Sequence, residues 1–79
     1  MKKKFKTKYT SPYSTEKETA TFLLNSFTMD GIEYLEFDSF DDRLRGYDGM
    51  FPIKNAKQLE DIGNYFLKLA TKYKNYEVK

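Results

Sequence analysis

An Asp-Gly pair at residues 30–31 is the feature of this 79-residue sequence that most constrains its fold. The pair lies between two runs, 19–29 and 32–40, that are rich in aromatic, aliphatic and Thr residues. Asp-Gly is preferred in two-residue type I′ turns, because both central positions need a positive φ. The sequence therefore predicts an antiparallel β-hairpin over residues 19–40, with Met29 opposite Ile32 and Phe27 opposite Tyr34.

This register assigns every hairpin side chain to one face of the sheet, since successive residues of a strand point to opposite faces. One face carries Ala20, Phe22, Leu24, Leu35 and Phe37. The other face carries Leu23, Phe27, Met29, Ile32, Tyr34 and Phe40, mixed with polar residues. Both faces are partly apolar, so we expect a sheet that is not simply solvated on one side.

A second pattern predicts an amphipathic helix over residues 55–74. Asn55 is a favourable N-cap, and Gln58, three residues later, completes a capping box. Apolar residues then recur at helical spacing on one stripe, which consists of Leu59, Ile62, Phe66, Leu69, Ala70 and Tyr73. We expect this stripe to cover the sheet face that carries Phe22, Leu24, Leu35 and Phe37. Close approach to that face would explain Gly63, because Gly in a helix is roughly 1 kcal/mol less favourable than Ala.

Two segments on either side of the hairpin complete the fold prediction. Residues 1–15 begin with lysines that alternate with Phe5, Thr7 and Tyr9, which indicates either an edge strand or a mobile basic arm. Residues 41–50 predict an acidic, Arg-containing loop, and a short extended segment follows at 51–53. The expected fold is a single α+β domain over residues 1–79. It is a small antiparallel sheet, the central hairpin plus one or two extra strands, with one C-terminal helix packed on one face.

The residue composition excludes several classes of chemistry. The chain has no Cys and no His, so disulfide frameworks, Cys/His zinc sites and Ser-His-Asp triads are absent. The acids of residues 38–48 lack the spacing of a calcium loop. We therefore expect no cofactor, no metal and no enzymatic activity. The longest apolar run is three residues, which predicts no membrane contact and a cytoplasmic protein.

The favoured function is a small protein-binding module. One helix covers one sheet face, so the cluster near the hairpin turn is left exposed unless Phe5, Tyr9 or Tyr13 of the N-terminal segment, or the C-terminal tail, folds over it. Interleaved Asp, Arg and Tyr in the following loop are typical of interface hot spots, although local ion pairs in a solvated loop explain them as well. The candidate partner-binding residues are Phe27, Met29, Ile32, Tyr34, Asp41, Asp42, Arg43, Arg45 and Tyr47. The partner is another protein or a second copy of the chain, as a homodimer.

The size and composition of the chain resemble those of one broad group of proteins. A length near eighty residues, many Lys, Tyr, Asn and Phe residues and no cofactor motif are similar to small proteins carried by phages and other mobile elements of AT-rich bacteria. Many such proteins are stoichiometric inhibitors of host machinery, anti-CRISPR proteins among them. The resemblance implies an inhibitor of a host protein, and no residue role carries over from it.

Nucleic-acid binding is the alternative function. Lysines of the N-terminal segment could contact phosphates while its aromatic rings stack on bases. The residues concerned are Lys2, Lys3, Lys4, Phe5, Lys6, Lys8 and Tyr9. Strands followed by one C-terminal helix also occur in small single-stranded-DNA-binding coactivator domains, which is an analogy of fold alone. Residues 30–48 weaken this alternative, because they hold seven acids against two arginines and would repel a nucleic acid.

Overall fold

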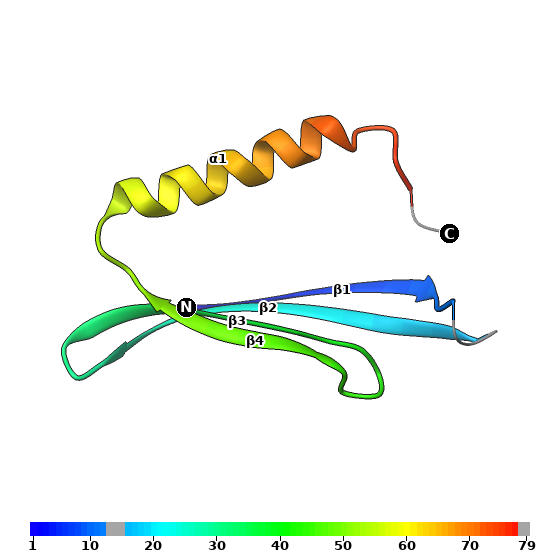
Figure 1. Cartoon of the computed structure of the whole chain (residues 1–79), viewed down its shortest axis with the longest axis horizontal. Helices are drawn as coiled ribbons and strands as arrows, with labels where there is room; N and C mark the ends of the chain where they lie inside the picture. Colours follow the sequence, from blue (N-terminus) through cyan, green and yellow to red (C-terminus); the bar gives the residue numbers. More distant parts are fainter. Residues whose placement is uncertain (13–15, 78–79) are drawn as a thin grey trace.

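The computed structural model, which describes residues 1–12 and 16–77, is a four-stranded antiparallel sheet followed by one helix (Figure 1). Its elements are β1 (Lys2–Thr10), β2 (Lys17–Met29), β3 (Ile32–Phe40), β4 (Gly46–Pro52) and α1 (Ala56–Lys72). Each strand pairs with the next one along the chain, in the order β1-β2-β3-β4. The predicted α+β fold with a single C-terminal helix is confirmed.

The central hairpin has the predicted register. Met29 lies opposite Ile32, and Phe27 lies opposite Tyr34. The turn residues Asp30 and Gly31 have φ values of 53° and 76°, the left-handed conformation that a type I′ turn requires. Local turn chemistry therefore determines which side chains share each face of β2 and β3.

The N-terminal segment forms an edge strand rather than a mobile arm. β1 pairs with β2 from Lys2 opposite Asn25 to Thr10 opposite Lys17. Phe5 lies opposite Phe22, and their ring centroids are 6.3 Å apart on one face of the sheet. This aromatic contact gives β1 a tertiary partner that a free arm would lack. Residues 13–15 of the predicted N-terminal segment lie outside the described residues.

The predicted loop over residues 41–50 is wrong in its second half, because residues 46–50 belong to β4. Gly46 and Gly49 are turn signals in the sequence, but here they allow close approach to β3. A Cβ on Gly46 would lie 1.6 Å from the carbonyl oxygen of Ser39, and one on Gly49 would lie 2.8 Å from the ring of Phe37. The connection between β3 and β4 is therefore limited to residues 41–45.

The helix begins as its sequence predicts, after the cap at Asn55, and ends at Lys72, two residues before the predicted end. The side chain of Asn55 accepts a hydrogen bond of 3.0 Å from the backbone N–H of Gln58. In return Gln58 Oε1 accepts from the N–H of Lys54, one residue before the cap, at 2.9 Å. At the other end the N–H of Tyr73 donates to the carbonyl of Leu69 at 2.9 Å.

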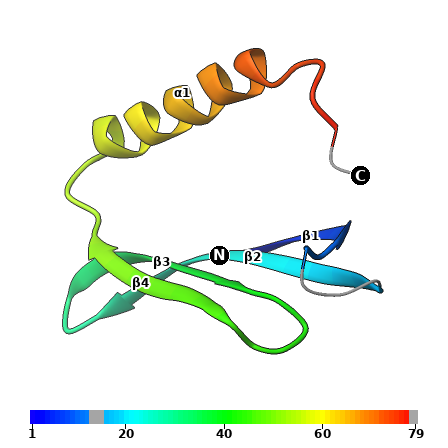
Figure 2. The same cartoon turned by 45° about the vertical axis from the view of Figure 1, so that its right-hand side comes forward.

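α1 starts on the expected side of the sheet but stands away from it (Figures 1 and 2). No Cα atom of α1 lies within 8 Å of a Cα atom in the four strands. Leu59, in the first turns of the helix, lines a hollow together with Leu24 and Leu35 of the sheet. The expectation that the stripe covers Phe22 and Phe37 is wrong.

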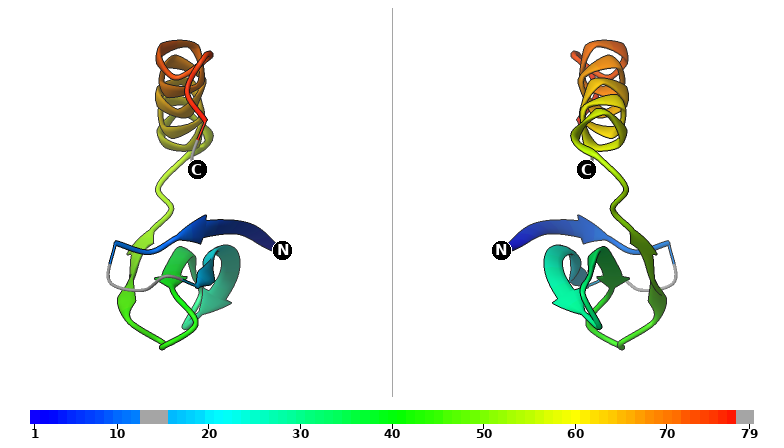
Figure 3. Two further views of the ribbon diagram at one scale, coloured as in Figure 1. Left: turned by 90° about the vertical axis from the view of Figure 1, so that its right-hand side faces the viewer. Right: turned by 90° about the vertical axis from the view of Figure 1, so that its left-hand side faces the viewer.

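The reason for this separation lies in the short connection at residues 53–55. The N–H of Ile53 donates to the carbonyl of Glu33 at 2.8 Å, so the chain stays bound to β3 until just before the helix. The N-cap then fixes the first turn, and the helix axis rises away from the sheet (Figure 1), so that the helix stands clear of the strands when it is viewed nearly along its axis (Figure 3). Close approach to this sheet does not explain Gly63, because nothing lies within 4 Å of a Cβ built there.

Because the helix stands away from the sheet, no apolar side chain among the described residues is buried. The buried residues are Ser11, Glu18 and Thr21. The accessible surface is 6960 Å², whereas a compact monomer of 9.4 kDa has roughly 5,000 Å². The radius of gyration is 15.2 Å, against about 12 Å for a compact domain of this length. The helix in the described part of the chain lacks the uninterrupted apolar length that a bilayer-spanning helix needs.

Candidate partner-binding surfaces

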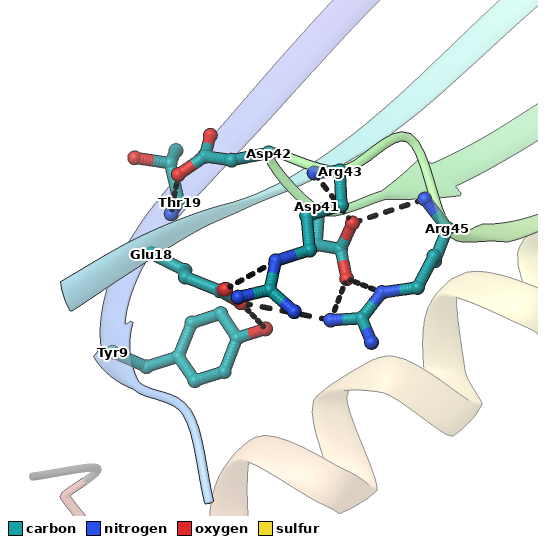
Figure 4. A network of polar contacts seen from close by, with 7 residues as sticks. All are labelled: Tyr9, Glu18, Thr19, Asp41, Asp42, Arg43 and Arg45. Carbon is teal, nitrogen blue, oxygen red and sulfur yellow. Dashed lines mark hydrogen bonds and ion pairs between the residues drawn. The ribbon is translucent and has the colours of Figure 1, made fainter. Parts of the chain in front are cut away.

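Asp41 organises the loop between β3 and β4 (Figure 4). Its Oδ1 accepts hydrogen bonds from the backbone N–H groups of Arg43 and Arg45, at 2.9 and 3.0 Å. Its Oδ2 lies 2.8 Å from both Nε and Nη2 of Arg45. One carboxylate therefore closes the turn and holds the arginine side chain that follows it.

Glu18, near the start of β2, joins this loop to the neighbouring strands at the same end of the sheet. Glu18 is buried, and its carboxylate lies 3.5 Å from Nε of Arg43 and 3.9 Å from Nη2 of Arg45. The hydroxyl of Tyr9 donates to the same carboxylate at 3.4 Å. A buried carboxylate needs such partners, because an unpaired charge in the interior is unfavourable. We call Tyr9, Glu18, Asp41, Arg43 and Arg45 the polar cluster.

Titration of the polar cluster follows from these contacts. The backbone N–H of Arg45 is the main cause that lowers the pKa of Asp41 below its ordinary value. The hydrogen bond to Asp41 raises the pKa of Arg45. Partial burial, followed by the nearby charge of Glu18, raises the pKa of Tyr9, so its hydroxyl stays protonated and donates. The ion pair and this donor are thus present together at neutral pH.

Most of the charged residues that were predicted to bind a partner are instead paired within their own chain. Asp41, Arg43 and Arg45 contact groups of their own chain, and Asp42 accepts a 2.8 Å hydrogen bond from the N–H of Thr19. These four residues therefore brace the loop against β2. In the part of the chain that the structure describes, no group of acidic residues is arranged to hold a metal ion.

Two apolar side chains project from this end of the sheet. Leu44 is 81% exposed and Tyr47 is 83% exposed. Leu44 also has a φ of 60°, a left-handed conformation that is unfavourable for a residue with a Cβ. Tyr47 was among the predicted binding residues, whereas Leu44 was not. A single Leu between two arginines of a tight turn is the signal that could have identified it.

The other predicted binding residues gather at the opposite end of β3. The rings of Phe27 and Tyr34 stack with centroids 5.6 Å apart, and Met29 and Ile32 beside them are exposed. We call these four residues the tip patch. Phe5 lies on the other face of the sheet and does not cover it, and Tyr13 lies outside the described residues. Residues 35–40 of β3 separate Tyr34 of the tip patch from the loop by about 20 Å, so the structure does not join them into one surface.

Another apolar surface is the sheet face on the side of α1. Strand pairing places six large apolar residues on it, which we call the apolar face: Phe5, Phe22, Leu24, Leu35, Phe37 and Phe51. The stripe of α1 is likewise unburied, and Phe66 at its centre is 48% exposed. Most residues of the apolar face and of the stripe were predicted from the sequence, but the two surfaces were expected to pack against each other. Sequence reasoning did not single out Tyr65 and Leu67, exposed residues that widen the apolar arc of the helix.

The lysines of β1 form a separate surface. Alternation along the strand places Lys2, Lys4, Lys6 and Lys8 on the face opposite Phe5. On that face Asp38 lies opposite Leu23, which itself lies opposite Lys4. The residues of the predicted nucleic-acid site are therefore divided, with these four lysines on one face and Lys3, Phe5 and Tyr9 on the other, where Nζ of Lys3 lies 5.9 Å from the ring centroid of Phe5.

Comparison of the chain with models of known protein families, with curated proteins and with solved structures finds no match.

Proposed function

We propose that this chain is a small, non-enzymatic protein-binding module whose fold is completed by a protein partner. One observation carries the proposal: no apolar side chain among the described residues is buried, although a sheet face and a helix stripe of suitable composition are both present. Exposed contiguous apolar surface is characteristic of sites that bind other proteins. Aromatic side chains, which are enriched in protein interfaces, supply much of both surfaces.

The polar cluster supports this proposal by contrast. Its arginines form ion pairs with Glu18 and Asp41 of the same chain and stabilise the loop. We therefore expect a partner to bind through apolar contacts and not through these charges. Leu44 and Tyr47 extend the exposed apolar surface to the loop end of the sheet. A stoichiometric inhibitor of a host protein, as the composition suggests, would act through contacts of this kind without chemistry of its own.

Affinity capture with matched variants tests the proposal. The tagged chain is incubated with a cell extract to which the untagged chain has been added, so that a partner of either kind is available. Phe66→Ser removes the centre of the stripe, and Lys68→Ser is the control on the opposite side of the same helix. We expect the tagged parent chain to retain a partner protein from the extract, the Phe66→Ser variant to lose this partner, and the Lys68→Ser variant to keep it. Equal retention by the parent and both variants would contradict the proposal, provided that circular dichroism shows all three to be folded.

A second candidate function, nucleic-acid binding, has one observation in its favour. Lys2, Lys4, Lys6 and Lys8 form a row of positive charges along one face of an edge strand, with a spacing of about 7 Å between neighbours. Such a row could follow a phosphate backbone. The test is fluorescence anisotropy with labelled DNA and RNA at about 50 and 200 mM salt, over which backbone-driven affinity falls by orders of magnitude. Binding that is unchanged when all four lysines are replaced by Gln would exclude this site.

A further inference from the structure

We infer that the partner of the apolar face is a second copy of this chain, and that two chains exchange helices so that α1 of each lies on the apolar face of the other. This inference rests on the proposed function, because it names the partner of the same surface. Three observations support it. The apolar face and the stripe of α1 are complementary, the chain exposes more surface than a compact monomer, and the connection between β4 and α1 is short.

The two open surfaces are complementary in kind. The apolar face of an antiparallel sheet is normally covered by a second layer, and an amphipathic helix is a standard covering layer. This chain carries such a face on the side of α1 and one such helix, and no Cα atom of the helix lies within 8 Å of a strand Cα. Each chain therefore offers one surface to be covered and one element to cover it. Two copies related by a two-fold axis satisfy both needs at once, as a closed dimer requires.

The exposed area has the size that a permanent dimer buries. The accessible surface of 6960 Å² exceeds that of a compact monomer by roughly 2,000 Å². Burial of this excess in both chains removes about 4,000 Å² in total, which lies within the range of obligate homodimers. A small peptide segment would cover much less of the apolar face and would leave the stripe exposed.

The connection between β4 and α1 favours exchange over closure within one chain. Three residues, 53–55, join the strand to the helix, and Ile53 remains hydrogen bonded to Glu33 of β3. Hydrogen bonds of the N-cap fix the helix start immediately afterwards. Short hinges of this kind promote exchange of an identical element between protomers.

Gly63 fits the same arrangement. It weakens the helix, and nothing in its own chain lies within 4 Å of a Cβ built there. Glycine at the side of an apolar stripe permits close backbone approach. In the exchanged dimer that approach is made to the sheet of the other chain.

Two single-cysteine variants test the exchange, because the natural chain contains no Cys. Ser39→Cys places a thiol on the sheet face of Phe22, and Ala70→Cys places one on the stripe. Both replacements are small and leave the large apolar side chains in place. One variant is labelled with ¹⁵N, the two are mixed through a denaturation and refolding step, and a short bis-maleimide is added. Mass spectrometry then identifies products that join one heavy and one light chain through residues 39 and 70.

We expect the parent to have twice the mass of one chain by light scattering, and the 39–70 product to form several-fold more than the control product. The control is Lys68→Cys mixed with Ser39→Cys, because residue 68 lies on the opposite side of the helix from residue 70. A dimer in which the 39–70 product does not exceed the 39–68 control would overturn the exchange.

A monomer would overturn the inference, and a chain with both Ser39→Cys and Ala70→Cys then distinguishes two cases. A monomer that cross-links within one chain has α1 closed on its own sheet, which would overturn the proposed function as well. A monomer that does not cross-link within one chain, yet still loses a retained protein on Phe66→Ser, would overturn the dimer and leave the proposed function standing.

Discussion

Replacement of Gly46 by Ala tests how β4 joins the sheet. A Cβ on Gly46 would lie 1.6 Å from the carbonyl oxygen of Ser39 and 2.8 Å from the Cα of Phe40. Both atoms belong to the backbone of β3, so rotation of a side chain cannot relieve the overlap. The strands must separate where Gly46 pairs with Phe40, and this separation also pulls Arg45 away from Asp41.

The expected loss follows from the size of the methyl group and the rigidity of its surroundings. Forcing extra atoms into a packed site costs about 1–3 kcal/mol, and an overlap with backbone atoms belongs in the upper half of that range. We therefore expect Gly46→Ala to lower the free energy of unfolding by roughly 2–3 kcal/mol. Urea denaturation followed by far-UV circular dichroism measures this loss. All variants are compared at one protein concentration, because association changes apparent stability.

Gly49→Ala in the same strand is the matched control. Its Cβ would lie 2.8 Å from a ring atom of Phe37, and that exposed ring can move aside. We expect a loss below about 1 kcal/mol, since a flexible side chain relieves the contact. A Gly46→Ala protein as stable as the parent, or a larger loss in Gly49→Ala, would refute the argument that backbone contact with β3 requires Gly46.

Three further predictions concern the loop and the tip patch. Leu44→Asn is expected to stabilise the fold by up to about 1 kcal/mol, because Asn tolerates the left-handed conformation better than Leu; a lower urea midpoint would contradict this. The pKa of Asp41 is lower in the folded chain than its ordinary value of about 3.9, so ionised Asp41 contributes to the free energy of unfolding in full above that ordinary value. The contribution is lost as the pH falls through the lowered pKa. The stability difference between the parent and Asp41→Asn should therefore shrink on acidification, and a difference independent of pH would argue against it. Phe27→Ala and Tyr34→Ala are expected to abolish retention of a protein other than this chain without unfolding it, whereas Met50→Ala, exposed on the same face, should not; retention by both variants would make the tip patch purely structural.

Local chemistry explains why the hairpin and the helix could be predicted from the sequence. The Asp30-Gly31 turn needs two positive φ values, and few dipeptides adopt them easily. The helix depends on a capping side chain at Asn55 and on apolar spacing within one segment. Neither element requires information from a distant part of the chain.

Features that depend on distant contacts were harder to predict. The choice between an arm and a strand at the N-terminus is decided by pairing with β2 and by the contact between Phe5 and Phe22. A glycine such as Gly46 or Gly49 is equally compatible with a turn that ends a strand and with close approach inside a strand, so the sequence does not distinguish the two. The same limit applies to the loop charges, whose partner Glu18 lies far away in sequence.

The position of α1 is the feature for which the sequence was least informative, and the reason is physical. An apolar stripe and an apolar face establish that both surfaces need covering, but they do not specify whether one chain or two provides the cover. The decision rests with the connection at residues 53–55, where the hydrogen bond from Ile53 to Glu33 and the N-cap of Asn55 set the direction of the helix. If two chains exchange helices, the tip patch stays exposed on the outer face of each sheet. The dimer would then present two copies of it, and a partner with two matching sites would bind with the added avidity of a linked pair.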